Sequence, residues 1–156
     1  MTYSVRVLTA TAIVLGLAST AAAQTFGIRA GVSGDPDQFF FGGHAETAPV
    51  IERLTFRPNV EIGLGDNVTL VALNIEFAYW LPIRNSPWSM YAGGGPAANI
   101  YSFDDDFPGR GNDDSEIRGG FNLLFGLQHD QGLFTEVKVG TIDSPDIKFM
   151  VGYAFR

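Results

Sequence analysis

The chain has 156 residues, a length typical of one domain, and it contains no cysteine. Disulfide bonds, thiol catalysis and cysteine-based zinc sites are therefore excluded, and the fold must be stabilised by packing and strand pairing. The formal net charge of −7 makes nucleic acid a poor partner, because a nucleic-acid-binding surface requires clustered cations.

The N-terminal segment has the pattern of an export signal. Arg6 is the single charged side chain before the apolar run Val7–Leu17, and the triplet Ala21–Ala23 follows a stretch of small residues. A cationic start, a short apolar run and an A-x-A site are typical of a cleaved secretory signal peptide, and such a run is short for a membrane-spanning helix. We therefore expect residues 1–23 to be a signal peptide and residues 24–156 to form the mature domain.

Eight segments of the mature domain are predicted as β-strands. Apolar and polar residues alternate in them with a period of two, and no segment has a sustained helical period. The predicted strands span residues 25–33, 38–47, 53–63, 68–81, 89–102, 117–128, 133–142 and 147–155. Clusters of Gly, Asn, Asp and Pro separate most of these segments, and the one long connection is 103–116. The sequence therefore predicts an all-β domain.

The two faces of the predicted strands differ in composition. In the segment 54–63, Leu54, Phe56, Val60 and Ile62 alternate with polar residues, and the apolar face of the whole domain holds no charge. The charged residues of the polar face are Arg29, Glu46, Arg57, Glu61, Glu76, Arg118, Glu136, Lys138 and Lys148. Their five cations and four acids nearly balance, which suits charges that are confined and paired.

Alternation alone permits two opposite proteins. A soluble barrel or sandwich would bury the apolar face, whereas an outer-membrane barrel would turn that face to lipid and enclose the polar one. The glycines favour the second arrangement, because the strand glycines lie mainly on the polar face, where a solvated surface has no need of them. The interior of an eight-stranded barrel is just wide enough for side chains to fill. We therefore expect the charged residues to form an ion-pair network in a lumen.

The remaining acids are concentrated in alternate connections between the predicted strands. They are Asp35, Asp37, Asp66, Asp104, Asp105, Asp106, Asp113, Asp114, Glu116, Asp143 and Asp146. Alternate connections of an up-and-down barrel share one end. We therefore expect one acidic rim and one nearly neutral rim, with both chain ends at the neutral one.

This pattern resembles the small eight-stranded outer-membrane barrel proteins of the OmpA- and OmpX-like kind. The resemblance covers residues 24–156, and its sharpest motif is the C-terminal segment IKFMVGYAF. The outward residues of that segment are Phe149, Val151, Tyr153 and Phe155. They look like the recognition signal of the outer-membrane assembly machinery, although Arg156 follows the last aromatic and Met150 stands where that signal usually has Gly.

The resemblance implies an eight-stranded antiparallel up-and-down transmembrane β-barrel in a Gram-negative outer membrane. It also implies outer-membrane lipid, lipopolysaccharide and the assembly machinery as partners, and a monomeric state. Two further features of the sequence bear on such a barrel, the prolines within strands and the aromatic residues near one rim. Pro58 and Pro96 interrupt predicted strands, and because a closed barrel has no edge for them, we expect local bulges. Tyr79, Trp80, Trp88 and Tyr91 surround the turn 82–87, and Tyr153 and Phe155 end the last strand at the same rim. Together they predict an aromatic girdle at the membrane interface.

No catalytic constellation emerges from the sequence. His44 lies on the polar face beside Glu46, where we expect it to be paired, and His129 lies in a turn; neither has the serine and acid that a hydrolase needs. The acids at 104–106 and 113–116 could offer oxygen ligands to Ca²⁺ but lack EF-hand spacing. We expect them to be solvated, or bridged to lipopolysaccharide phosphates by divalent ions. We therefore expect no enzyme activity and no cofactor.

Two functional hypotheses follow. The first is a non-catalytic outer-membrane barrel with a side-chain-filled polar lumen and a structural, adhesive or interaction role through its acidic rim. The alternative is a soluble periplasmic ligand-binding β-barrel with an apolar interior.

Overall fold

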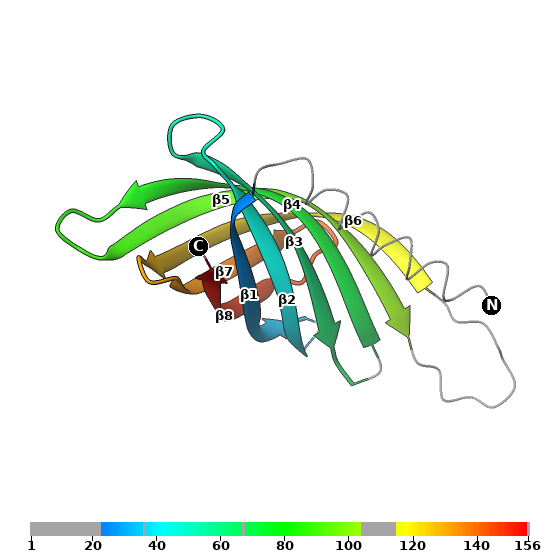
Figure 1. The fold of residues 1–156 in the computed structure, drawn as a ribbon. Coiled ribbons are helices and arrows are strands. Elements are labelled where there is room, and N and C mark those ends of the chain that lie inside the picture. The colour runs from blue at the N-terminus through cyan, green and yellow to red at the C-terminus, as the bar shows by residue number, and fades with distance from the viewer. Residues whose placement is uncertain (1–22, 36, 67, 104–114, 156) are drawn as a thin grey trace, which may run out of the picture.

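The computed structural model describes residues 23–35, 37–66, 68–103 and 115–155, with side chains described from Thr25 to Ser102 and from Glu116 onward within these ranges. The described residues form eight strands and no helix, and they close into one barrel (Figure 1). The strands are β1 (Ala23–Gly34), β2 (Gln38–Thr47), β3 (Leu54–Leu64), β4 (Val68–Pro82), β5 (Trp88–Phe103), β6 (Ser115–His129), β7 (Leu133–Thr141) and β8 (Ile147–Phe155). The predicted signal peptide lies almost wholly outside the described residues.

Each strand pairs antiparallel with its neighbours in the chain, and β1 pairs with β8 to close the barrel. The predicted eight-stranded antiparallel all-β barrel is confirmed, and every predicted strand end lies within two residues of the observed one. Among the described residues, no helix is long and apolar enough to cross a membrane.

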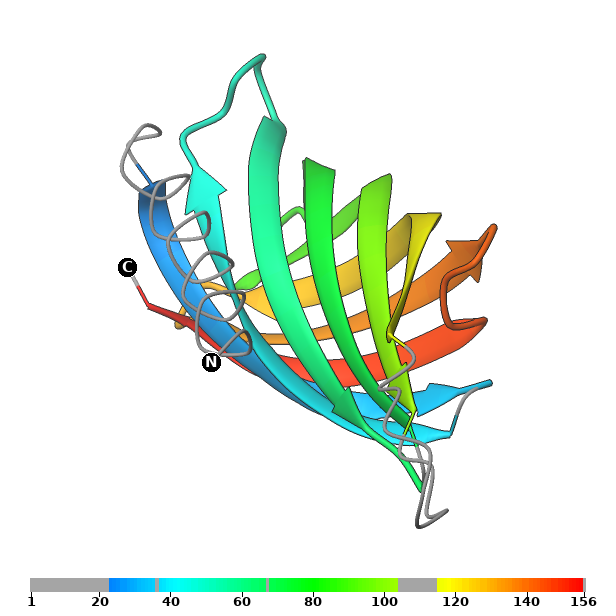
Figure 2. The same ribbon diagram turned by 90° about the vertical axis from the view of Figure 1, so that its right-hand side faces the viewer.

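The connections alternate between the two ends of the barrel because consecutive strands run in opposite directions. The turns after β1, β3, β5 and β7 share one end, which is the end that carries the predicted acidic rim. The loops after β2, β4 and β6 lie at the other end, where β1 begins and β8 ends; we call this the terminal end. The long strands β4, β5 and β6, of 15, 16 and 15 residues, form hairpins that project past their neighbours (Figures 1 and 2).

Burial is inverted relative to a water-soluble protein. Large apolar side chains on all eight strands point outward, and Phe125 and Ile28 are 55% and 59% exposed. The charged side chains of β1 to β4, β7 and β8 point inward, and Arg57 and Glu61 are each 1% exposed. The interior also holds a few apolar groups, among them Phe40, Leu124 and Phe134. The apolar face of the sequence is therefore the outer wall, and the polar face lines the lumen.

Three inward glycines make room for the rings opposite them. Gly27 is the register partner of His44, Gly126 of Tyr91 and Gly152 of Phe134. A Cβ atom at any of these glycines would collide with the ring of its partner. The glycine pattern of the polar face thus reflects how little space an eight-stranded barrel leaves for side chains.

The two strand prolines are accommodated without the predicted bulges, so that prediction was wrong. The β4–β5 register is the same on both sides of Pro96, and only the ladder contacts opposite it are interrupted. Pro58 keeps its place in the β3–β4 register opposite Ile75, but the β2–β3 ladder ends beside it, at the pair His44–Asn59. Because proline has no N–H to donate, the missing bonds leave gaps in the ladder and the register does not shift.

Candidate functional site

The lumen network has two acidic centres, and the first is Glu61 of β3. Its carboxylate accepts hydrogen bonds from the Nζ atoms of Lys138 and Lys148, each at 2.8 Å. The Nη1 atom of Arg29 lies 3.4 Å from the same carboxylate. These side chains are essentially inaccessible to solvent. One buried acid therefore links three cations from β1, β7 and β8.

The second centre is Glu136 of β7. It accepts hydrogen bonds from Nη1 of Arg29 at 3.2 Å, from Nη1 of Arg57 at 3.1 Å and from the Tyr91 hydroxyl at 2.7 Å. The Arg57 guanidinium also lies 4.6 Å from the centre of the Tyr91 ring. Arg29 bridges the two centres, because it contacts both Glu61 and Glu136.

Asparagines connect the network to the wall formed by β3, β4 and β6. Lys138 Nζ lies 2.8 Å from Glu76, and Glu76 accepts a 2.6 Å hydrogen bond from Asn59. Asn59 in turn accepts from Asn74 at 2.7 Å, and Asn74 accepts from Asn122 at 2.9 Å. This chain runs from β7 through β4 and β3 to β6, and each of its asparagine side chains has a hydrogen-bond partner within it.

The structure brings together eight of the nine charged residues that the sequence assigned to the lumen. Glu46 joins through Arg57, whose Nε lies 3.2 Å from its carboxylate. Arg118 does not join. Its side chain is 39% exposed, forms an ion pair with Glu116 at 2.6 Å and lies over the Tyr101 ring, toward the acidic end. Without Arg118 the described network contains four cations and four acids, so its formal charges balance.

The proposed assembly-signal residues occupy the last strand. Phe149, Val151, Tyr153 and Phe155 of β8 all point outward and are exposed. Met150 between them points into the lumen, where its sulfur lies 3.6 Å from Nη1 of Arg29. An inward Gly at this position would leave that space empty.

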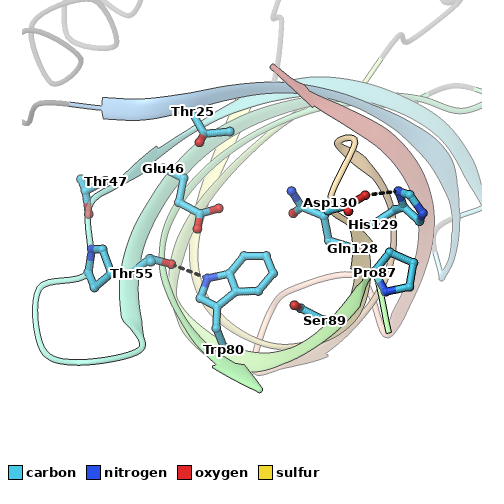
Figure 3. A pocket seen from close by; sticks show the side chains of 11 residues that line it. Thr25, Glu46, Thr47, Thr55, Trp80, Pro87, Ser89, Gln128, His129 and Asp130 are labelled. Carbon is cyan, nitrogen blue, oxygen red and sulfur yellow. Dashed lines mark hydrogen bonds and ion pairs between the residues drawn. The ribbon is translucent and has the colours of Figure 1, made fainter. Parts of the chain in front are cut away.

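At the terminal end the lumen opens into a cavity of about 580 Å³. Figure 3 shows Glu46, Trp80, Ser89 and Gln128 pointing into the ring of strands there. Trp80 donates a 3.0 Å hydrogen bond from Nε1 to Thr55 Oγ1, and its ring lies 4.7 Å from that of Tyr91. We name this space the mouth cavity; Glu46 and Tyr91 connect it to the ion-pair network.

The aromatic girdle predicted around the turn 82–87 is only partly present. Tyr79 is exposed on the outer wall, but Tyr91 is 2% exposed inside the lumen and Trp80 is half-buried at the mouth cavity. The predicted inclusion of Tyr91 and Trp80 was wrong. Strand alternation could have found the correct side, since both residues are flanked by outward apolar neighbours.

His44 is buried in the lumen, but it is not paired as the sequence predicted. Neither ring nitrogen has a hydrogen-bond partner among the described residues, and the ring packs edge-on against Phe134 at 5.4 Å between centroids. Within the described ranges, no group of three His, Asp or Glu side chains could hold a metal ion. The acids at 104–106, 113 and 114 lie outside those ranges.

No family model and no curated protein matches the chain. Among solved structures, the chain is similar to Neisserial surface protein A (NspA), with 14% identity, a TM-score of 0.65 and coverage of 83% of this chain and 93% of that one. It is also similar to the N-terminal β-barrel domain of Pseudomonas aeruginosa OprF, with 12% identity, a TM-score of 0.60 and coverage of 85% and 98%. Both are small eight-stranded outer-membrane barrels, and the chain has their fold, as the sequence pattern predicted.

Proposed function

We propose that the protein is a non-catalytic transmembrane β-barrel of a Gram-negative-type outer membrane, exported by residues 1–23. The observation that carries this proposal is the inverted burial: an apolar belt covers the outer wall of all eight strands while charged side chains fill the interior. A closed barrel pairs most of its backbone within the sheet and has no open edge, which is what a bilayer requires. Strands of 9 to 16 residues suit a span that needs about 9–11.

The lumen supports a structural rather than a transport role. The side chains of Arg29, Glu61, Glu136 and Lys138 are inaccessible to solvent and connect opposite walls. Such a network joins opposite walls of the barrel, and breaking it is costly because removing one partner leaves a buried charge uncompensated. A lumen occupied by side chains in this way supports a barrel that does not pass solutes freely.

The acidic end supports an interaction role. The described acids there are all exposed: Asp35, Asp37, Asp66, Glu116, Asp143 and Asp146. Arg118 is the described cation among them and is paired with Glu116. A rim of this charge would contact lipopolysaccharide phosphates through divalent cations, or a cationic partner, by electrostatic complementarity. Phe149, Val151, Tyr153 and Phe155 would present β8 to the assembly machinery.

The alternative of a soluble ligand-binding barrel requires an apolar interior. Eight charged side chains occupy the described lumen, and the apolar belt would face water in such a protein. An exposed apolar surface of that extent favours aggregation or association in water. The soluble alternative therefore has no observation in its favour.

Fractionation combined with cysteine accessibility tests the proposal. The expressed protein should be found in the detergent-soluble outer membrane and should migrate differently on gels before and after heating. In a chain without native cysteine, a lipid-soluble quencher should reach a label at Phe125→Cys but not at Asn122→Cys. Recovery in the periplasmic wash, or protection of Phe125→Cys from bilayer quenchers, would rule out the membrane assignment.

A further inference from the structure

The barrel wall contains a seam between β2 and β3 that the backbone ladder does not close. β2 remains paired with β1 to Thr47, and β3 remains paired with β4 from Leu54. The β2–β3 pairing nevertheless ends at His44–Asn59. Pro58 is the next residue of β3 and has no N–H with which to continue the ladder. The segments 45–47 and 56–58 therefore form a seam on the terminal side of the barrel.

Side chains hold this seam together in place of the ladder. The Phe56 N–H donates a 3.2 Å hydrogen bond to Thr47 Oγ1. On the lumen side, Arg57 Nε lies 3.2 Å from the Glu46 carboxylate. Both contacts involve rotatable side chains, so they can open without disturbing the pairing of β2 with β1 or of β3 with β4. The β2–β3 ladder, with six register pairs, is the shortest between neighbouring strands of the described barrel.

The inner side of the seam is polar and rich in hydrogen-bond acceptors. Glu46, Thr47 and Thr55 line the mouth cavity beside it. The cavity also holds the Trp80 ring and the amide of Gln128, which points into the ring of strands (Figure 3). The Gln128 residue is 4% exposed, and its Oε1 has no hydrogen-bond partner in the protein. A carboxylate, an unpartnered carbonyl oxygen and an indole face are groups that bind an ammonium ion.

The outer side of the seam is an apolar groove of about 620 Å³. Its outward lining is formed by Phe26, Gly43, Ala45, Pro58, Val60, Leu73, Ile75, Pro96 and Ala98. Ala45 and Pro58 belong both to this groove and to the seam. The groove exists because small residues and prolines replace the long apolar side chains found elsewhere on the belt. A Cβ at Gly43 would have its nearest neighbour at 3.4 Å, so this position has room.

We propose that the seam is a binding site for a membrane amphiphile with an ammonium-bearing head group. The acyl chain would lie in the outer groove, and the head group would pass between β2 and β3 into the mouth cavity. The polar cavity and the apolar groove lie on the two sides of one unpaired stretch, which matches the two halves of a phospholipid. The site rests on the proposed membrane function, since only a barrel in a bilayer meets such a ligand from the side.

Ala45→Leu and Ala92→Leu make a matched pair of variants to test the site. Both alanines point outward, but Ala45 lines the groove, whereas Ala92 lies on β5 between Tyr79 and Phe125 and outside it. The probe is palmitoyl lysophosphatidylethanolamine, bound to the purified barrel in detergent and counted by native mass spectrometry. Ala45→Leu should weaken binding about tenfold by occupying the groove, while Ala92→Leu should not change it.

The head group is tested by comparing that probe with palmitate. Palmitate has no ammonium group for the oxygens of Glu46 and Gln128 to accept hydrogen bonds from, so it should bind about tenfold more weakly than the ammonium-bearing probe. In a Trp88→Phe background, binding of the ammonium probe should also change the fluorescence of Trp80. Equal binding of both probes, or no response of Trp80, would overturn the placement of the head group.

Four further outcomes are distinguishable. Equal loss of binding in both Leu variants would mean nonspecific association with the belt and would overturn the site. A stable dimer that Ala45→Leu disrupts would mean that a second copy of the chain covers the groove, and it would also overturn the lipid assignment. If bilayer quenchers fail to reach Phe125→Cys, the membrane function itself fails; if they reach it and Ala45→Leu binds normally, only the seam site fails.

Discussion

The ammonium group of Lys138 lies 2.8 Å from a carboxylate oxygen of Glu76, across the lumen from β7 to β4. The same ammonium is 2.8 Å from Glu61. Lys138 therefore holds two acids of adjacent strands, and Glu76 needs Lys138 and Asn59 as its partners. The net attraction within such a buried arrangement contributes little to the stability of the fold. Removing one of its members is nevertheless strongly destabilising.

We expect Glu76→Ala to lower the free energy of unfolding by about 3–5 kcal/mol, because the change removes one partner of a buried pair. The control is Asp66→Ala in the β3–β4 turn, where the side chain is exposed and the effect should stay within about 0.5 kcal/mol. Urea unfolding of the refolded barrel in detergent measures both. Equal small effects would show that the Glu76 carboxylate is solvated.

Tyr91→Phe isolates one hydrogen bond of the Glu136 centre. The ring that faces Arg57 stays, and only the 2.7 Å hydrogen bond to Glu136 is lost. A hydrogen bond to a charged group contributes about 1.5–3 kcal/mol to stability, so the free energy of unfolding should fall by that amount. Tyr79→Phe on the outer wall removes a hydroxyl from an exposed side chain and should leave the transition unchanged. Similar shifts in both variants would contradict the buried placement of Tyr91.

Strand alternation predicted which residues of this barrel are inside, and turn residues predicted where the strands end. These signals are local in the sequence, so they can be read without knowledge of the tertiary structure. Alternation does not give the height of a residue along the barrel axis, because height depends on the stagger between strands. Arg118 illustrates this limit. It is on the inward side of β6, but its register places it beside Asn99 near the acidic end, above the network that it was expected to join.

The seam was beyond prediction for a related reason. The sequence shows Pro58 in a strand, and a bulge is the usual way for a sheet to absorb proline. Which neighbouring ladder loses its hydrogen bond depends on whether the missing N–H points to β2 or to β4. The Phe56 N–H points toward β2. The backbone nitrogen of Pro58, two residues later, faces the same strand. One-residue differences of this kind follow from the register and not from composition.

The filled lumen predicts that the barrel is impermeable to small sugars. Liposomes containing the purified protein should not swell in isotonic arabinose, because Arg29, Glu136 and Lys138 close the interior. Liposomes with a sixteen-stranded porin, whose interior is an aqueous channel, serve as the positive control. Swelling at a porin-like rate would show that the network opens in a bilayer.

The packing of the Tyr91 ring against Gly126 gives the last prediction. Gly126 and Gly119 both lie in β6, but they differ in what a methyl group would meet. At Gly126 a Cβ would collide with the Tyr91 ring, whereas at Gly119 nothing lies within 4 Å. Gly126→Ala must displace Tyr91 from both Arg57 and Glu136, and overpacking of this kind lowers stability by about 1–3 kcal/mol.

Gly119→Ala should instead be neutral or stabilising by up to about 1 kcal/mol, because alanine restricts the unfolded chain more than glycine does. The two variants add the same atoms to the same strand, so the difference between their urea unfolding midpoints compares a crowded inward position with an open outward one. Gly126→Ala combined with Tyr91→Phe should lose less than the two single changes together, since both act on the Tyr91–Glu136 hydrogen bond. Full additivity would mean that the methyl group at residue 126 leaves the Tyr91 ring in place, and that the glycines of the polar face are not there to make room for the lumen side chains.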